Sequence, residues 1–172
     1  MSDSTDTDDV QPREVELMHP PDEHLYRQVV NAEFLDDNRP TYQAFMPHSE
    51  SDELSVDRGA VLTAQAAYQN FLDHGGSSVG AWPVSVDDVH QAGLRAFDDS
   101  AKPGRHDGHA YISFNANPQE TNNARKNWRK QRAGDLAHRA SKHGPAYLPE
   151  SSRSAGLVAL PLPLDEPNSE SL

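Results

Sequence analysis

The connections between the apolar segments of this chain are short, and that limits the folds that it can adopt. Turn-forming Gly, Pro, Asn and Asp residues separate runs of β-type residues from two segments with helical periodicity. A parallel β-α-β crossover needs roughly a dozen residues or more between its strands, and most of the connections here are too short for one. The sequence therefore predicts an α+β domain with a small, mixed or mostly antiparallel sheet packed by two main helices.

The expected elements follow the order β-β-β-α-β-α-β-β-α. Strands are expected over residues 23–30, 42–46, 54–56, 79–86, 94–97 and 109–114. Helices are expected over residues 58–73, 87–92 and 123–143. Asp57 is the expected cap of the first helix, and Gly75 and Gly76 are expected to end it. Pro83 indicates an edge strand or a bulge.

Both ends of the chain have the composition of disordered tails. Residues 1–14 form an acidic N-terminal tail, and residues 150–172 form a Pro- and Ser-rich tail that opposes a helix. We therefore expect a single α+β domain over residues 15–149. Residues 157–164 differ from the rest of the second tail because they include four Leu. Such a strip either packs on the domain itself or is a docking motif for a partner.

Composition excludes several classes of function. The 172 residues include no cysteine, which rules out disulfides, thiolate metal sites, iron–sulfur clusters and cysteine nucleophiles. No stretch approaches the ~20 apolar residues of a membrane-spanning helix, so no membrane role is expected. The acidic N-terminus is unlike a secretory signal peptide, and we expect a cytoplasmic protein. The many Ala, Asp, His and Arg residues suggest a bacterial source of high GC content or a halophile.

The charge of the chain is distributed unevenly. Its 27 acidic and 15 basic residues give a formal net charge of -12, and such a surface repels nucleic acid and anionic membranes. Residues 121–150 nevertheless contain seven basic and two acidic residues. This basic segment coincides with the expected helix over residues 123–143. It either contacts the acidic remainder of the protein, keeps a helix face solvated, or binds a partner.

The helix over residues 123–143 is the main candidate binding surface. Its apolar side, with Trp128, Leu136 and Ala140, is expected to pack on the sheet, and its basic side is expected to stay exposed. The leading prediction is a small non-catalytic binding protein, such as an accessory subunit, an immunity-like or an antitoxin-like protein, that acts through protein contacts. A nucleic-acid-associated protein is the first alternative. The candidate partner-binding residues are Arg125, Lys126, Arg129, Lys130, Arg132 and Arg139.

An enzyme is the second alternative, and part of it rests on two histidines. His106 and His109 bracket Asp107 and Gly108, a composition that suits a metal ion such as zinc. Loop histidines beside a Gly turn explain the same pattern without a metal. The HExxH, GxxxxGK[ST] and GxSxG motifs are absent, so no cofactor is predicted. His106 and His109 remain candidate ligands of a metal-dependent enzyme, and His109 is also a candidate catalytic residue.

Residues 23–28, EHLYRQ, resemble the opening strand of ADP-ribosyltransferase-like domains. In that family an aliphatic-Tyr-Arg strand contributes a residue that contacts NAD. The resemblance implies that Arg27 contacts NAD and is a candidate catalytic residue. It also implies an acidic or polar catalytic residue on a later strand, and residues 109–114 contain no acidic side chain.

Overall fold

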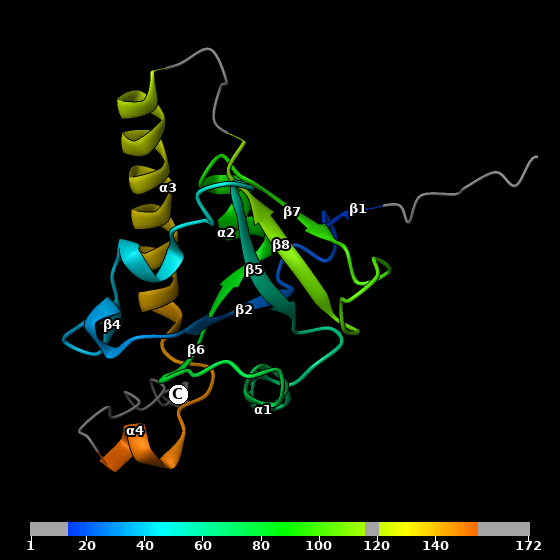
Figure 1. Cartoon of the computed structure of the whole chain (residues 1–172), viewed down its shortest axis with the longest axis vertical. Helices are drawn as coiled ribbons and strands as arrows, with labels where there is room; N and C mark the ends of the chain where they lie inside the picture. Colours follow the sequence, from blue (N-terminus) through cyan, green and yellow to red (C-terminus); the bar gives the residue numbers. More distant parts are fainter. Residues whose placement is uncertain (1–13, 116–120, 155–172) are drawn as a thin grey trace, which may run out of the picture.

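An antiparallel sheet of six strands forms the centre of the computed structural model, which describes residues 14–115 and 121–154 (Figure 1). The strand order is β1-β7-β8-β5-β2-β6. The strands are β1 (Val15–Glu16), β2 (His24–Val29), β5 (Glu53–Arg58), β6 (Gly80–Ser85), β7 (Arg95–Asp98) and β8 (His109–Ser113). A separate ribbon contains β3 (Leu35–Asp36) and β4 (Arg39–Pro40). The expected α+β fold with a mostly antiparallel sheet is confirmed.

Helices cover the two faces of the sheet unequally. They are α1 (Ala64–Asp73), α2 (Val86–Gln91), α3 (Asn122–His143) and α4 (Glu150–Ser154), with 3-10 turns η1 (Ala32–Phe34) and η2 (Tyr42–Phe45). One face joins the main core, and α2, α3 and η2 pack against it. Figure 1 shows α3 running along that side of the sheet. The buried Ala67 of α1 lies outside this core, and α1 packs beside β2 and β6.

Alternation along the strands decides which side chains reach which face. In β5, Leu54 and Val56 are buried in the main core, whereas Asp57 points to the second face. In β8, Ala110 and Ile112 belong to the core, and His109 lies on the second face. The second face is partly open, since Ser55 on it is exposed. Polar side chains of neighbouring strands therefore gather on that face.

Local sequence signals explain the helix limits. Thr63 caps α1, and its side chain accepts a hydrogen bond from Ala66 N. Ser85 and Asp88 form a reciprocal capping box at the start of α2. The helix end expected near Gly75 is confirmed, since α1 stops at Asp73. Pro83 lies in β6, the outermost strand of the sheet, as expected.

The packing expected for the long helix is confirmed in its second half. Leu136 and Ala140 are fully buried, and α3 packs against η2 and β6. Trp128 is only partly buried, and it meets the ring of Phe114 edge-on with the centroids 6.4 Å apart. The helix is therefore held mainly by small side chains that allow close approach to the rest of the core.

Two expected elements are wrong. The strand expected over residues 42–46 is instead the 3-10 turn η2 (Tyr42–Phe45). In this conformation the successive residues Ala44 and Phe45 are both buried in the main core. The first helix begins at Ala64 rather than near residue 58, and Asp57 is a strand residue instead of its cap. The alternation of buried and polar side chains continues to the end of β5, so this stretch gains more from sheet pairing than from an early helix.

The region after α3 stays packed on the domain. Tyr147 bridges to Ala81 at the free edge of β6, and Leu148 is buried. The first residues of the expected C-terminal tail form α4, where Ser152 Oγ donates a hydrogen bond to Val79 O at 2.7 Å. Residues 1–13 and 155–172, with the Leu-rich strip 157–164, lie outside the described residues. No helix within the described ranges is long and apolar enough to cross a membrane.

Candidate functional site

Two histidines and two aspartates meet on the second face of the sheet. Asp57 of β5 and His109 of β8 are direct cross-strand partners. Asp99 follows β7, and His106 comes from the loop between β7 and β8. We call Asp57, Asp99, His106 and His109 the imidazole site. Neighbouring strands thus bring together residues that are well separated in the sequence.

Each imidazole of the site is held by its own carboxylate. His109 Nδ1 is hydrogen-bonded to Asp99 Oδ1, and His106 Nε2 lies 2.6 Å from Asp57 Oδ1. A carboxylate in this position accepts the ring N–H, which leaves the other ring nitrogen with its lone pair. Neither His109 Nε2 nor His106 Nδ1 has a hydrogen-bond partner within the described residues. The two rings lie at 89° with centroids 5.4 Å apart.

Burial differs along the site. The Asp99 side chain is fully buried, that of His109 is 8% exposed, and that of His106 is 29% exposed. Solvent therefore reaches the site from the side of His106. Gly108, with a φ of +84°, forms the turn in which His109 N donates a hydrogen bond to His106 O. A side chain at Gly108 would meet Val61 at 3.1 Å, so a larger residue would disturb the site.

The electrostatics of the site centre on Asp57. Burial raises the pKa of Asp57 above the ordinary value of 3.8, and the hydrogen bond from His106 offsets only part of the effect. The positive charge of Arg27, and a charge on His109 when that ring is protonated, act in the same direction as that hydrogen bond. Burial also lowers the pKa of Arg27 to about 10. A buried carboxylate next to imidazoles is an arrangement that concentrates at functional sites.

One arginine contacts the imidazole site directly, and a second joins the strands beside it. Arg105 Nε lies 3.2 Å from Asp99 Oδ2, which has no hydrogen-bond partner within the described residues. Arg58 binds Glu23 through two nitrogens, at 2.8 and 3.0 Å, and Asp98 at 2.7 Å. These contacts tie β2, β5 and β7 together at the end of the sheet where the imidazole site lies.

The structure brings the sequence-predicted residues His106 and His109 together beside Asp57, which sequence reasoning placed as a helix cap. Arg27 lies between the core residues Leu25 and Val29 on the same side of β2, so it lies on the face of the sheet opposite the imidazole site, from which its charge acts on Asp57. The Arg27 guanidinium, however, donates to Ala44 O at 2.9 Å and to Ser55 O at 3.1 Å. Arg27 therefore holds η2 against β5.

Sequence reasoning missed Asp57 and Asp99 as site residues. The alternation of buried and polar residues that begins at Leu54 continues to Asp57, beyond the strand predicted over residues 54–56. A prediction that extended this strand would have placed the Asp57 carboxylate opposite the strand that begins with His109. For Asp99 no local pattern exists, because its burial depends on the path of the loop that follows β7.

The imidazole site does not have the ligand set of a metal centre. Among residues 14–115 and 121–154, no group of three or more His, Asp or Glu is arranged to hold a metal ion. His106 and His109 each use one ring nitrogen for a carboxylate. The site instead contains two oriented imidazoles, and each has one ring nitrogen without a hydrogen-bond partner within the described residues. This arrangement is suited to proton transfer.

The candidate partner-binding residues on α3 mostly contact the protein itself. Arg129 NH2 lies 2.5 Å from Asp52, and Arg139 donates to Gln91 and lies 3.4 Å from Asp88. The side chains of Arg129 and Arg139 are 17% and 27% exposed. The expectation that the basic side stays exposed is therefore wrong for Arg129 and Arg139, because nearby acids attract their guanidinium groups, whereas Lys126 and Lys130 are exposed as expected.

The other basic residues of α3 differ from one another. Lys130 and Arg132 each lie over an aromatic ring, at 4.6 and 5.5 Å from its centroid. Arg125 and Lys126 make no ion pair within the described part of the chain. These two residues are what remains of the predicted basic surface for an acidic partner.

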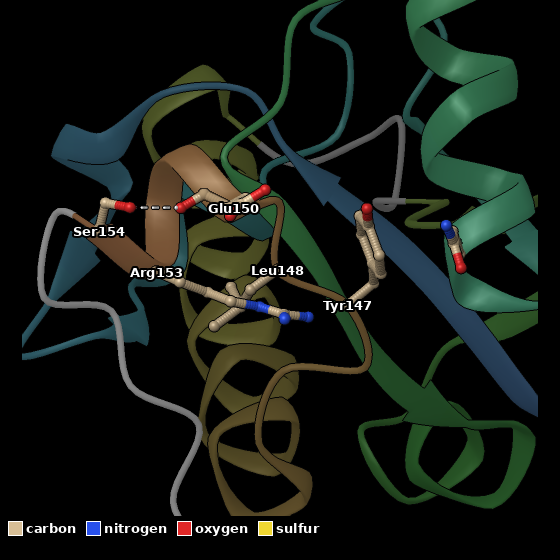
Figure 2. A pocket seen from close by; sticks show the side chains of 6 residues that line it. Tyr147, Leu148, Glu150, Arg153 and Ser154 are labelled. Carbon is tan, nitrogen blue, oxygen red and sulfur yellow. Dashed lines mark hydrogen bonds between the residues drawn. The ribbon is translucent and has the colours of Figure 1, made fainter.

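A cavity of about 660 Å³ lies away from the imidazole site, between α1 and α4 (Figure 2). Its lining residues are Gln65, Tyr147, Leu148, Glu150, Arg153 and Ser154. Figure 2 shows Arg153 extending over Leu148. The lining includes no histidine and no pair of facing carboxylates, so proton-transfer chemistry is better supported at the imidazole site.

Comparisons of the chain with protein-family models, with curated proteins and with solved structures found no match.

Proposed function

We propose that the protein is an acid–base enzyme whose chemistry is carried by the imidazole site. The observation that supports this most is the pair of buried carboxylates, each holding one nitrogen of a neighbouring imidazole. Orientation of a histidine by a buried carboxylate is how many hydrolytic enzymes select the tautomer that accepts a proton.

The two histidines take different roles. His109 is held by the fully buried Asp99, and its Nε2 takes a proton from water as the water oxygen attacks an ester centre. His106, protonated on both nitrogens and paired with Asp57, gives its Nδ1 proton to the leaving oxygen as that bond breaks. Water thus supplies the hydroxyl and the proton that the two products gain. Solvent then returns a proton to His106 and accepts the one held by His109.

Energetics favour this proposal over a purely structural role. Burying a carboxylate disfavours folding unless strong partners compensate, and apolar residues in its place are often neutral or stabilising. Asp57 retains a raised pKa even with its partners in place, so its environment disfavours the charged form. A buried carboxylate with a perturbed pKa that lies beside two imidazoles is the kind of group that concentrates at functional sites.

Hydrolysis of three probe esters tests the proposal: p-nitrophenyl acetate, p-nitrophenyl phosphate and bis(p-nitrophenyl) phosphate. We expect turnover of at least one of them, with a maximum between acid and alkaline pH, because one imidazole must be neutral and the other protonated. His109→Gln should abolish it, and His143→Gln is the matched control at an exposed histidine. Turnover that survives His109→Gln, or no turnover of any probe, would contradict the proposal.

A second candidate function is attachment of an anionic partner to the N-terminal half of α3. Arg125 favours it, because its guanidinium has no ion pair and its Nε is buried without an acceptor within the described residues. Joint replacement of Arg125 and Lys126 by Glu should then remove partners captured from a nuclease-treated lysate. Lys142→Glu, at the other end of the helix, is the control. Capture that is unchanged in the double variant would exclude this surface.

A further inference from the structure

Arg105 differs from Arg27 and Arg58 in the partners of its guanidinium nitrogens. Arg58 uses all three guanidinium nitrogens on Glu23 and Asp98. Arg27 uses two nitrogens on backbone carbonyls and is buried. Arg105 Nε lies 3.2 Å from Asp99 Oδ2, the guanidinium makes no hydrogen bond within the described residues, and its side chain is 37% exposed. Its two terminal nitrogens have no partner within the described residues, so they are free to bind a ligand.

The charges around the site leave room for one anion. Asp57 and Asp99 carry two negative charges when ionised, and Arg27 and Arg105 carry two positive ones. Lys102 is already paired with Glu14. The protonated imidazole that the proposed function requires adds one unbalanced positive charge. A substrate with a single negative charge at its reacting centre would neutralise the site.

We infer that the site acts on a phosphodiester, with Arg105 binding the non-bridging oxygens; this inference rests on the proposed function. A phosphodiester carries one negative charge, and a terminal guanidinium edge fits two of its oxygens. His109 Nε2 takes a proton from the attacking water, the new phosphorus–oxygen bond forms, and the bond to the leaving oxygen breaks. His106 gives that oxygen a proton, and the product is a phosphomonoester and an alcohol.

The net charge of -12 favours a small phosphodiester over a long polyanion. Interactions beyond about 8 Å are screened at physiological salt, so a single phosphate senses mainly Arg105 and the imidazoles. A long nucleic acid would place further phosphates against the acidic surface of the rest of the protein. The inferred substrate is therefore a small molecule such as a cyclic or dinucleotide-sized phosphodiester.

Histidine-ring NMR of the full chain, titrated with dimethyl phosphate, tests the inference. The rings of His106 and His109 should shift in a saturable way, whereas those of His24 and His143 should not. Arg105→Ala should weaken binding by about 10-fold or more, the effect of losing a charge-assisted hydrogen bond. Arg153→Ala, at an exposed arginine elsewhere, is the matched control.

Three further arms make the result decisive. Arg105→Lys keeps a charge beside Asp99 and covers the case in which Arg105→Ala unfolds; it should also bind dimethyl phosphate more weakly than the wild type. Acetate at equal ionic strength should give a weaker shift than dimethyl phosphate, and an RNA hexanucleotide should bind no more tightly than dimethyl phosphate. An equal response to acetate, tighter RNA binding, or full affinity in Arg105→Lys would overturn the inference. If one of these results is found but His109→Gln still abolishes ester turnover, the acid–base function stands and only the phosphodiester inference fails.

Discussion

Two pairs of histidines in the described part of the chain meet edge-on, and they differ in the carboxylates that hold them. His74 and His106 form a third pair, tilted at 35° with centroids 5.9 Å apart. The rings of His106 and His109 and those of His24 and His143 have the same centroid separation, 5.4 Å, and similar edge-on geometry. In the second pair only His143 has a carboxylate partner, Asp88, at 2.7 Å. Residue type and ring spacing therefore do not distinguish the two pairs.

The environment of the carboxylates does distinguish them. Burial acts to raise the pKa of Asp88, but hydrogen bonds from Ser85 and His143 outweigh it and the pKa is lowered. Asp88 also lies in the first turn of α2, where the helix dipole favours a negative charge. Asp57 has no helix terminus beside it, and its pKa is raised. We therefore expect Asp88 to stabilise the fold, and ionised Asp57 to lower its stability.

The largest expected effect is that of Asp99→Asn on catalysis. The amide cannot hold the His109 tautomer as the carboxylate does, so kcat of the best probe ester should fall about 100-fold or more, with little change in KM. The ring ¹⁵N shifts of His109 should report the altered tautomer. Asp88→Asn should leave kcat unchanged. Equal losses in the two variants would remove the distinction between the pairs.

Asp88→Ala should instead lower stability. It removes the capping box of α2 and the contacts of Asp88 with Arg139 and His143, which join α2 to α3. We expect a loss of about 1–2 kcal/mol in the free energy of unfolding, measured by urea denaturation. A loss below about 0.3 kcal/mol would show that Asp88 is not a structural carboxylate.

The stability difference between wild type and Asp88→Ala should depend on pH in a defined direction. A lowered pKa means that Asp88 stabilises the folded state fully above the unfolded value of 3.8. This contribution is lost as the pH falls through the lowered pKa. Urea unfolding at pH 5 and at decreasing pH below 3.8 checks it. A difference that grows with acidification would contradict the assignment.

The smallest expected effect, with the opposite sign, is that of Asp57→Asn. Because its pKa is raised, ionised Asp57 disfavours the folded state once the pH exceeds that pKa, and it has no such effect below 3.8. Asparagine still accepts the hydrogen bond from His106. The variant should be neutral or more stable by up to about 1 kcal/mol at neutral pH, and the gain should vanish in acid. A clear loss at neutral pH would assign Asp57 to structure.

Most of the secondary structure was predictable from local patterns. The strand over residues 54–56 and the long helix over residues 123–143 follow from the alternation and the helical spacing of their apolar residues. The prediction failed at residues 42–46, where the pattern of apolar residues also suits a 3-10 turn. A few residues with mixed apolar spacing do not distinguish these conformations, and contacts with α3 decide between them.

The sequence by itself determined the fold class, the long helix and the presence of candidate histidines, because these depend on residue spacing and type. Only the tertiary structure decided that His106 meets Asp57, which lies 49 residues away, and that Arg129 of α3 meets Asp52, which precedes β5. The pairing of β5 with β8 and the turn at Gly108 bring His106 to Asp57. The packing of α3 on the domain brings Arg129 to Asp52. Desolvation then gives the same residue types opposite roles, since it raises the pKa of Asp57 whereas capping lowers that of Asp88.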